Sequence, residues 1–249
     1  FGWFAVGYQQ AKLMGQDALA GKIDKAIRRH MKIQAPGGYF PEHIGPATLY
    51  HQVSLGGMAD FHRHNPHKET LAAVRRGVGF LVRALYPDLR GIETFDERNR
   101  LYQPMSFQPG LFWSTEGRTL MSRRMPPMRE QVRNQPAGQP VSGRAWWEIG
   151  SAFRAFEHAV ATQGGRFATE LPIDREQFSW RLENKGLVRK DGPWFYAMSA
   201  WAHNVDQGNP YHLERTQALS IYHDATGLIV GGGNDKRAYR NATIHILEG

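Results

Sequence analysis

The sequence predicts an α+β fold in which helices come first and antiparallel strands follow. Up to about residue 165, apolar residues recur at steps of three and four, which places them on one face of a helix. After about residue 172, short runs alternate apolar and polar residues, and Gly, Asn and Asp separate the runs. Helices followed by strands indicate two segregated layers or domains. We therefore expect a helical domain over 1–165 and an antiparallel β-sandwich domain over 172–249.

The helical domain is expected to contain antiparallel helix pairs, one over about 3–33 and another over about 47–86. Asp17 is a suitable N-cap for the second helix. The clearest helix follows Asn65-Pro66, and it should end by Tyr86 because the next residue is a proline. Hairpins of this kind stacked around an axis make an incomplete α/α toroid, and a simple helical bundle is the alternative.

A long irregular connection is expected over about 88–143, because this stretch contains six prolines. It also carries large apolar residues, so we expect an ordered loop packed over another part of the chain: Phe107, Leu111, Phe112 and Trp113. One further helix should run from about Ser142 to Gly164-Gly165.

The β domain is expected to contain short strands between turns that are rich in Gly, Asn and Asp. The expected strands cover about 178–182, 186–190, 194–201, 218–222, 228–230 and 243–247.

The composition favours a polyanionic partner. The formal net charge is +8, because 31 Lys and Arg outnumber 23 Asp and Glu. No dense basic run or basic helix occurs, which argues against nucleic acid. No run of about eighteen apolar residues occurs either, so no membrane partner is expected. The chain has no Cys, which excludes disulfides and Cys-ligated zinc. We therefore expect an acidic polysaccharide or oligosaccharide as the partner.

The stretch from Gly37 to His51 holds two tyrosines, two histidines and a carboxylate between glycines and prolines. Pro46 suits the first turn of a helix, where its missing N–H costs nothing. Tyr50-His51 then lies near that helix start, close to Glu42-His43 in the preceding loop. Proton-transfer groups gathered where a loop meets a helix are what a general acid–base site needs. An aromatic-rich turn with two surface histidines is the alternative interpretation.

Other residues could complete such a site. Arg98 and Arg100, in a loop dense in charge, could bind a carboxylate in bidentate fashion. His203 follows a predicted strand and could face a cleft. Trp113 and Trp147 could stack on sugar rings, although core packing is the default for either one.

Three histidines, at positions 62, 64 and 67, have a spacing that suggests metal ligands. They surround Asn65-Pro66 at a helix end, without a carboxylate in step. We therefore expect a solvated helix terminus there and no metal site.

The order Gly-Gly-Tyr-Phe-x-Glu, then Pro, then Tyr-His at a helix start resembles the heparinase II/III-like polysaccharide lyases. In that family an α/α toroid is followed by an antiparallel β-sandwich. His203-Asn204-Val205-Asp206 and residues 219–233 are similar to the end of a strand and a glycine turn in the family's sandwich. The family's Asn-His pair on an earlier helix is missing here, where 5–11 reads Ala-Val-Gly-Tyr-Gln-Gln-Ala, and its His-x-His pattern has Val at position 205.

The resemblance implies a lyase that cleaves a uronic-acid-containing polysaccharide by β-elimination, without a cofactor. The roles it implies are proton transfer by Tyr50, assistance by His51 or His203, orientation of a histidine by Glu42, substrate contact by His43, and attraction of the uronate by Arg98 and Arg100.

Two other functions stay open. A glycoside hydrolase of the same toroid type would need two carboxylates at one cleft, for which Glu42 with Asp96 or Glu97 are candidates. A non-catalytic carbohydrate-binding relative would have kept the fold without the chemistry. The chain opens on Phe1 without a Met, so we expect a piece of a longer polypeptide, from a periplasmic or extracellular protein.

Overall fold

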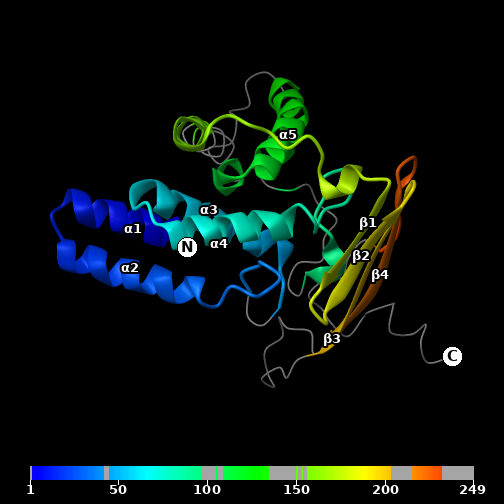
Figure 1. The fold of residues 1–249 in the computed structure, drawn as a ribbon, viewed down its shortest axis with the longest axis horizontal. Helices are drawn as coiled ribbons and strands as arrows, with labels where there is room; N and C mark the ends of the chain where they lie inside the picture. Colours follow the sequence, from blue (N-terminus) through cyan, green and yellow to red (C-terminus); the bar gives the residue numbers. More distant parts are fainter. Residues whose placement is uncertain are drawn as a thin grey trace. The chain divides into compact units, whose positions relative to one another are not determined.

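The computed structural model describes residues 2–41, 45–96, 105, 109–134, 150, 153, 156–202 and 215–231. Helices dominate the first part of the chain, and one antiparallel five-stranded sheet follows them (Figure 1). The α+β prediction is therefore confirmed. In the part of the chain that the structure describes, every helix is too short or too polar to cross a membrane.

The chain divides into two compact units that alternate along the sequence. Unit 1 comprises Phe1–Gln34, Gln52–Gly79 and Ser106–Leu171, and unit 2 comprises Ala35–His51, Phe80–Met105 and Pro172–Gly249. The sequence pattern suggested one boundary, between 163 and 175. One change of unit falls there, and the others follow residues 34, 51, 79 and 105.

Unit 1 is helical. Its elements are α1 (Gly2–Leu13), α2 (Asp17–Met31), most of α3 (Thr48–His64) and α4 (Lys68–Leu81), the 3-10 helix η2 (Pro109–Trp113), α5 (Thr115–Arg133) and helical residues 156–163. Helices α1 and α2 run side by side as a hairpin (Figure 1). The two helices are in contact at Gly7, where a Cβ would lie 3.4 Å from the Ile23 side chain. Asp17 is the first residue of α2 rather than its cap, and it pairs with Lys12 across the turn.

Polar contacts join α2 to the connection between α3 and α4. Asp24 accepts hydrogen bonds from Arg28, at 2.7 Å, and from Asn65, at 3.0 Å. The apolar core of unit 1 contains the fully buried side chains of Ile27, Leu55 and Phe61. Apolar packing in the core and these hydrogen bonds between α2 and the α3–α4 connection therefore both stabilise unit 1.

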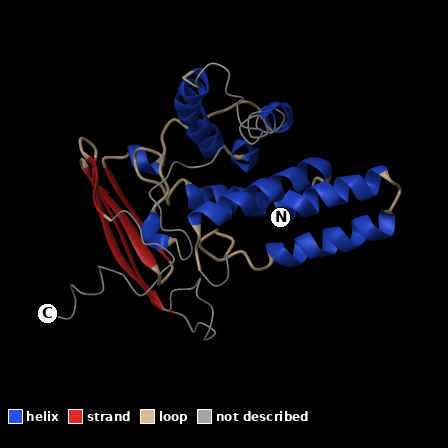
Figure 2. Ribbon diagram, turned by 180° about the vertical axis from the view of Figure 1, so that it is seen from behind, coloured by secondary structure: helices blue, strands red, loops and turns tan. Residues whose placement is uncertain are grey.

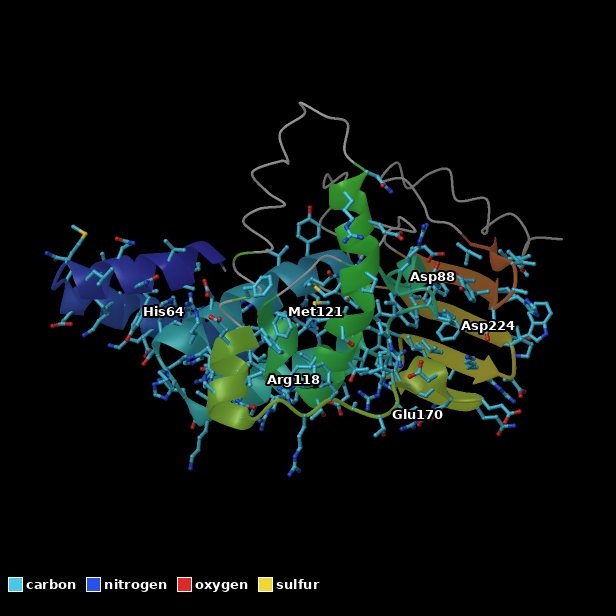
Figure 3. The ribbon with its side chains drawn as sticks, turned by 90° about the horizontal axis from the view of Figure 1, so that it is seen from above. His64, Asp88, Arg118, Met121, Glu170 and Asp224 are labelled. Atoms are coloured by element: carbon cyan, nitrogen blue, oxygen red, sulfur yellow. The ribbon has the colours of Figure 1, made fainter. Side chains whose placement is uncertain are left out.

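Helix α5 lies in the stretch that the sequence predicted as irregular, and that prediction is wrong. Its first turn is capped by Ser114, whose hydroxyl accepts the Gly117 N–H at 2.9 Å. Arg118 and Met121, labelled in Figure 3, lie on this helix. Pro126 and Pro127 follow in its second half. Those prolines caused the wrong prediction, because proline disfavours a helix interior without excluding it.

Unit 2 contains the sheet, whose strands are drawn in red in Figure 2. The strands are β1 (Gln177–Leu182), β2 (Gly186–Asp191), β3 (Trp194–Ala202), β4 (Arg215–His223) and β5 (Gly227–Val230). They pair in sequence order, each antiparallel to the next. The five expected strands within 178–230 are therefore confirmed, and the expected strand over 243–247 lies outside the described residues.

One face of the sheet forms the core of unit 2. Trp180 packs edge-on against Phe80 and Phe95, with ring centroids 5.9 and 6.3 Å apart. Gly186 allows the close approach, since a Cβ there would lie 2.3 Å from the Phe95 ring. Tyr86 covers the next part of the same face, at 5.5 Å from Phe195.

Helix α4 ends at Leu81, earlier than the apolar stripe suggested. The chain then turns, and Leu85 forms an antiparallel bridge with Gly91. The 3-10 helix η1 (Glu93–Phe95) follows, and a second one, η3 (Pro172–Asp174), precedes the sheet. Of the last expected helix, 156–163 is helical and Gly164 closes it with a φ of +78°, whereas its expected start near Ser142 lies outside the described residues.

Candidate functional site

The structure describes three of the residues that the sequence put forward as site residues. These are Tyr50, His51 and Trp113. Six others lie outside the described residues: Glu42, His43, Arg98, Arg100, Trp147 and His203. The candidate site can therefore be built from Gly37 to Phe40 and from Thr48 to His51, all of which belong to unit 2.

A tight turn begins the motif. The Ala35 N–H donates to the Tyr39 carbonyl at 2.9 Å, and the Gly38 N–H donates to the Ala35 carbonyl at 2.8 Å. Gly38 adopts a φ of +94°, a conformation that other residues rarely adopt. The Gly37 N–H donates to a carboxylate oxygen of Glu183, in the turn after β1, at 2.9 Å. The sheet of unit 2 therefore fixes this turn through a charged side chain.

Glu183, Lys185 and Tyr39 form a polar cluster under the turn. The Lys185 ammonium donates to Glu183 at 2.7 Å and to the Tyr39 hydroxyl at 2.9 Å. The Tyr39 hydroxyl donates at 3.4 Å to the same Glu183 oxygen, Oε2, that accepts from Lys185. Each of the three side chains is thus hydrogen-bonded to the other two, and a largely buried charged group requires such partners.

Electrostatics keep this cluster in one protonation state at neutral pH. Burial raises the pKa of the Tyr39 phenol, and the Lys185 ammonium offsets this only in part. Burial opposes ionisation of Glu183, but hydrogen bonds from Lys185 and Gly37 outweigh it, so the pKa of this carboxyl lies below 4.5. Burial also acts to lower the pKa of Lys185, but Glu183 and Tyr39 raise it above 10.5. The cluster is a neutral phenol beside an ion pair, which suits positioning rather than proton transfer.

His51 is a buried ring that holds the turn from the helix side. Its Nδ1 accepts the Phe40 N–H at 3.1 Å, so the proton of the neutral ring is on Nε2. The imidazole stacks on Phe40 and meets Phe80 edge-on, with centroids 5.9 and 4.9 Å apart. None of its surface is exposed. The expectation that His51 acts as a second base must be corrected, because a ring enclosed in this way positions the loop.

Tyr50 precedes His51 in the first turn of α3 and is partly exposed. Two residues earlier, the buried Thr48 hydroxyl donates to Asp96 at 3.0 Å. The helix start is therefore anchored on both sides of Tyr50, by Thr48 and by His51. A phenol on a rigid, anchored helix end meets the positional demand of general acid–base catalysis.

Asp96 was a candidate for the carboxylate pair of a glycoside hydrolase. Its side chain is fully buried and accepts the Thr48 hydroxyl hydrogen bond. The Asp96 carboxylate therefore anchors the start of α3. Because it is buried there, it is a poor candidate for one of the two catalytic carboxylates of a glycoside hydrolase.

A second buried cluster in unit 2 was not anticipated. Glu93, 2% exposed, accepts hydrogen bonds from Tyr86 at 2.8 Å and from Ser220 at 3.0 Å. Since Ser220 donates to Glu93, Thr94 is the donor in the bond between its hydroxyl and Ser220. Burial first, and the Glu93 charge second, raise the pKa of Tyr86 well above 10. This cluster ties η1 to β4 and lies too deep to meet a polymeric substrate.

Trp113, expected to stack on sugar, is buried in unit 1 with 2% of its surface exposed. Its indole meets His62 and His158 edge-on, at 4.7 and 5.4 Å, and its carbonyl accepts a hydrogen bond from Arg75 at 3.3 Å. The role in substrate binding is therefore corrected to core packing, the default for a tryptophan.

The three histidines around Asn65 lie at the end of α3 and in the connection that follows it. His62 accepts the His67 N–H through Nδ1 at 3.2 Å, which closes the end of α3. Among the described residues, no three side chains of the metal-binding types are grouped to hold an ion. His64, labelled in Figure 3, lines an open pocket of about 530 Å³ together with Arg63, Glu157, His158 and Ala161.

No local pattern indicates Glu183 or Lys185, because they lie about 146 residues from the turn that they hold. A signal did exist for two aromatic residues on the strand surface, the exposed Trp194 and the partly exposed Tyr196. They occupy alternate positions of a strand and so share one face, which the alternating pattern could have shown.

Comparison with protein-family models gave no match, and comparisons with curated proteins and with solved structures gave none either.

Proposed function

We propose that this chain is a polysaccharide lyase that cleaves a uronic-acid-containing polysaccharide by β-elimination. The observation that carries the proposal is the anchored helix start, where Thr48 and His51 fix the backbone on both sides of the partly exposed Tyr50. The net charge of +8 supports an acidic polymer as substrate. A periplasmic or extracellular location, where such polymers are met, belongs to the same proposal.

In the reaction, a base removes the proton at C5 of the uronic acid and the bond between C4 and the leaving oxygen breaks. A double bond forms between C4 and C5, and the leaving oxygen takes up a proton. Because charge develops on the carboxylate side of the sugar, fixed positive groups there stabilise the intermediate. We assign proton transfer to the Tyr50 hydroxyl, with His51 as a positioning residue that holds the preceding turn.

The residues outside the described part of the chain keep their proposed roles. Arg98 and Arg100 would neutralise the uronate, His203 would serve as the assisting base, and Glu42-His43 would contact the sugar beside Tyr50.

The test is the Tyr50→Phe variant, assayed by absorbance of the unsaturated product on polymers rich in uronic acid. Loss of the hydroxyl should lower kcat by about 100-fold or more, the usual contribution of a general acid–base group. Tyr8→Phe is the matched control, since Tyr8 is also partly exposed and lies in unit 1. Equal activity of both variants would remove Tyr50 from the mechanism.

A further inference from the structure

The outer face of the sheet in unit 2 carries a row of exposed aromatic residues. Along β3, Phe195 and Ala197 are fully buried, whereas Trp194 and Met198 are 40% and 48% exposed. Tyr196 lies between these two on the outer face and is partly exposed. Large aromatic rings seldom stay exposed together without a partner.

The two aromatic rings of this row are held parallel. The Trp194 and Tyr196 ring planes are inclined by only 15°, with centroids 6.4 Å apart. That distance matches the repeat of alternate residues on a strand, about 6.6 Å, so the backbone sets the spacing. His223, the cross-strand neighbour of Trp194 on β4, meets the indole edge-on at 4.6 Å. The imidazole in turn accepts the Ala225 N–H at 3.1 Å, which fixes its orientation.

Charged side chains flank the rings on the other side. Arg189 is the cross-strand partner of Tyr196 on β2, and Asp191 is the partner of Trp194. Their side chains form an ion pair at 3.2 Å while 61% and 51% exposed. Such an exposed pair is weak, so Arg189 can turn to a ligand carboxylate at little cost. Figure 3 shows Asp224 at this end of the sheet, in the turn after β4.

We infer that Trp194, Tyr196, Arg189 and His223 form a saccharide-binding platform for a uronic-acid unit. The apolar faces of the sugar ring stack on the aromatic rings, and Arg189 binds the carboxylate in bidentate fashion. The identity of the sugar as a uronate rests on the proposed function, whereas the stacking does not.

Charge distinguishes this occupant from a protein partner. The middle of the same face carries Leu187, Met198 and Leu219 on β2, β3 and β4, and the charged member of this cross-strand row, Arg181, lies at its far end on β1. The aromatic end, in contrast, combines flat rings with a guanidinium, an imidazole and a carboxylate. The hydroxyls and the carboxylate of a sugar acid can bond to these groups, whereas an apolar protein surface would offer them no partner.

The experiment measures binding of a uronic-acid tetrasaccharide to the full chain by NMR titration, in a Tyr50→Phe background so that the ligand is not consumed. The indole N–H signal of Trp194 should shift on addition of the ligand. Trp194→Ala or Tyr196→Ala should weaken binding by about tenfold. Met198→Ala, an exposed neighbour on the same strand, should leave the affinity unchanged. Arg189→Gln should weaken binding of the acidic tetrasaccharide but not of its carboxyl-reduced counterpart.

The inference is overturned if the aromatic variants bind as tightly as Met198→Ala, or if the Trp194 signal does not move at saturation. Failure of the lyase proposal is distinguishable from this. In that case the unmodified chain would not turn over the substrate, but the platform would still bind the tetrasaccharide with the same affinity.

Discussion

The turn that precedes α3 depends on one charged side chain from the sheet of unit 2, and Glu183→Gln removes its charge with little change of shape. The carboxylate accepts the Gly37 N–H at 2.9 Å and the Lys185 ammonium at 2.7 Å. Both side chains of the ion pair are only about a fifth exposed, at 21% and 22%, so water screens the pair poorly. We expect the substitution to destabilise the turn locally rather than unit 2 as a whole.

The magnitude follows from the two bonds. A hydrogen bond to a charged group contributes roughly 1 kcal/mol more than a neutral one. Of the three hydrogen bonds that Glu183 accepts, those from Gly37 and Lys185 are shorter than the one from Tyr39 and are the two counted here. Glutamine keeps an acceptor for Gly37 but no charge for Lys185. The variant should therefore lose about 2 kcal/mol of local stability, which corresponds to about a thirtyfold change in an equilibrium constant.

Hydrogen exchange of the Gly37 amide, followed by NMR, measures this local stability directly. Exchange in Glu183→Gln should be about thirtyfold faster than in the unmodified chain. The stability of the turn should also depend on pH. Because the folded pKa of Glu183 lies below 4.5, the carboxylate stabilises the turn above that value and loses this effect as the pH falls through the folded pKa.

The control is Glu176→Gln, which neutralises an exposed carboxylate one residue before β1. It should leave Gly37 exchange unchanged. If Glu183→Gln also left it unchanged, the hydrogen bond between Glu183 and the turn would contribute nothing, and the account of how the motif is positioned would be wrong.

Three further predictions concern stability. His51→Ala leaves a buried N–H unpaired and a cavity among aromatic rings, so it should lower the free energy of unfolding by about 3 kcal/mol in urea titration. Burial lowers the pKa of His30 from 6.5 to about 4, so His30 is protonated at a lower pH in the folded state than in the unfolded state. Stability should therefore decline by about 2 kcal/mol between pH 6.5 and 4, and less in His30→Gln. Gly117→Ala would place a Cβ 1.9 Å from a carbonyl oxygen of η2 and should cost about 2 kcal/mol or more, whereas Gly21→Ala, with open space around it, should stabilise α2 by about 0.5 kcal/mol in thermal unfolding.

The sheet was predictable because each strand has a buried and an exposed face. In β3, the alternation of Trp194 to Ala200 between exposed and buried positions is visible as a period of two in the sequence. Turn residues such as Gly192, with a φ of +55°, mark where one strand ends and the next begins. These signals are local, so one sequence suffices to read them.

Helix α5 was not predictable by the same means. Pro126 and Pro127 are strong local signals against a helix, but Ser114 caps the first turn, and Leu120 and Met121 in the first half are buried in the core of unit 1. Tertiary packing therefore outweighs local propensity here.

In the candidate site, too, some features follow from local sequence signals and others depend on tertiary contacts. Its position at a loop–helix junction could be predicted from Gly38, Pro46 and the Tyr50-His51 pair. The partners that hold it could not, because Glu183 and Lys185 reach it only through the fold. The assignment of Trp113 failed because a sequence does not distinguish a buried indole from an exposed one.

Mass spectrometry of the products from a uronic-acid oligosaccharide tests the lyase proposal most directly. Elimination adds no water, so the masses of the two fragments should sum to that of the substrate, with a new C4–C5 double bond in one of them. Fragments that together exceed the substrate by one water would instead show hydrolysis, and an oligosaccharide recovered intact would show that this chain performs no such cleavage.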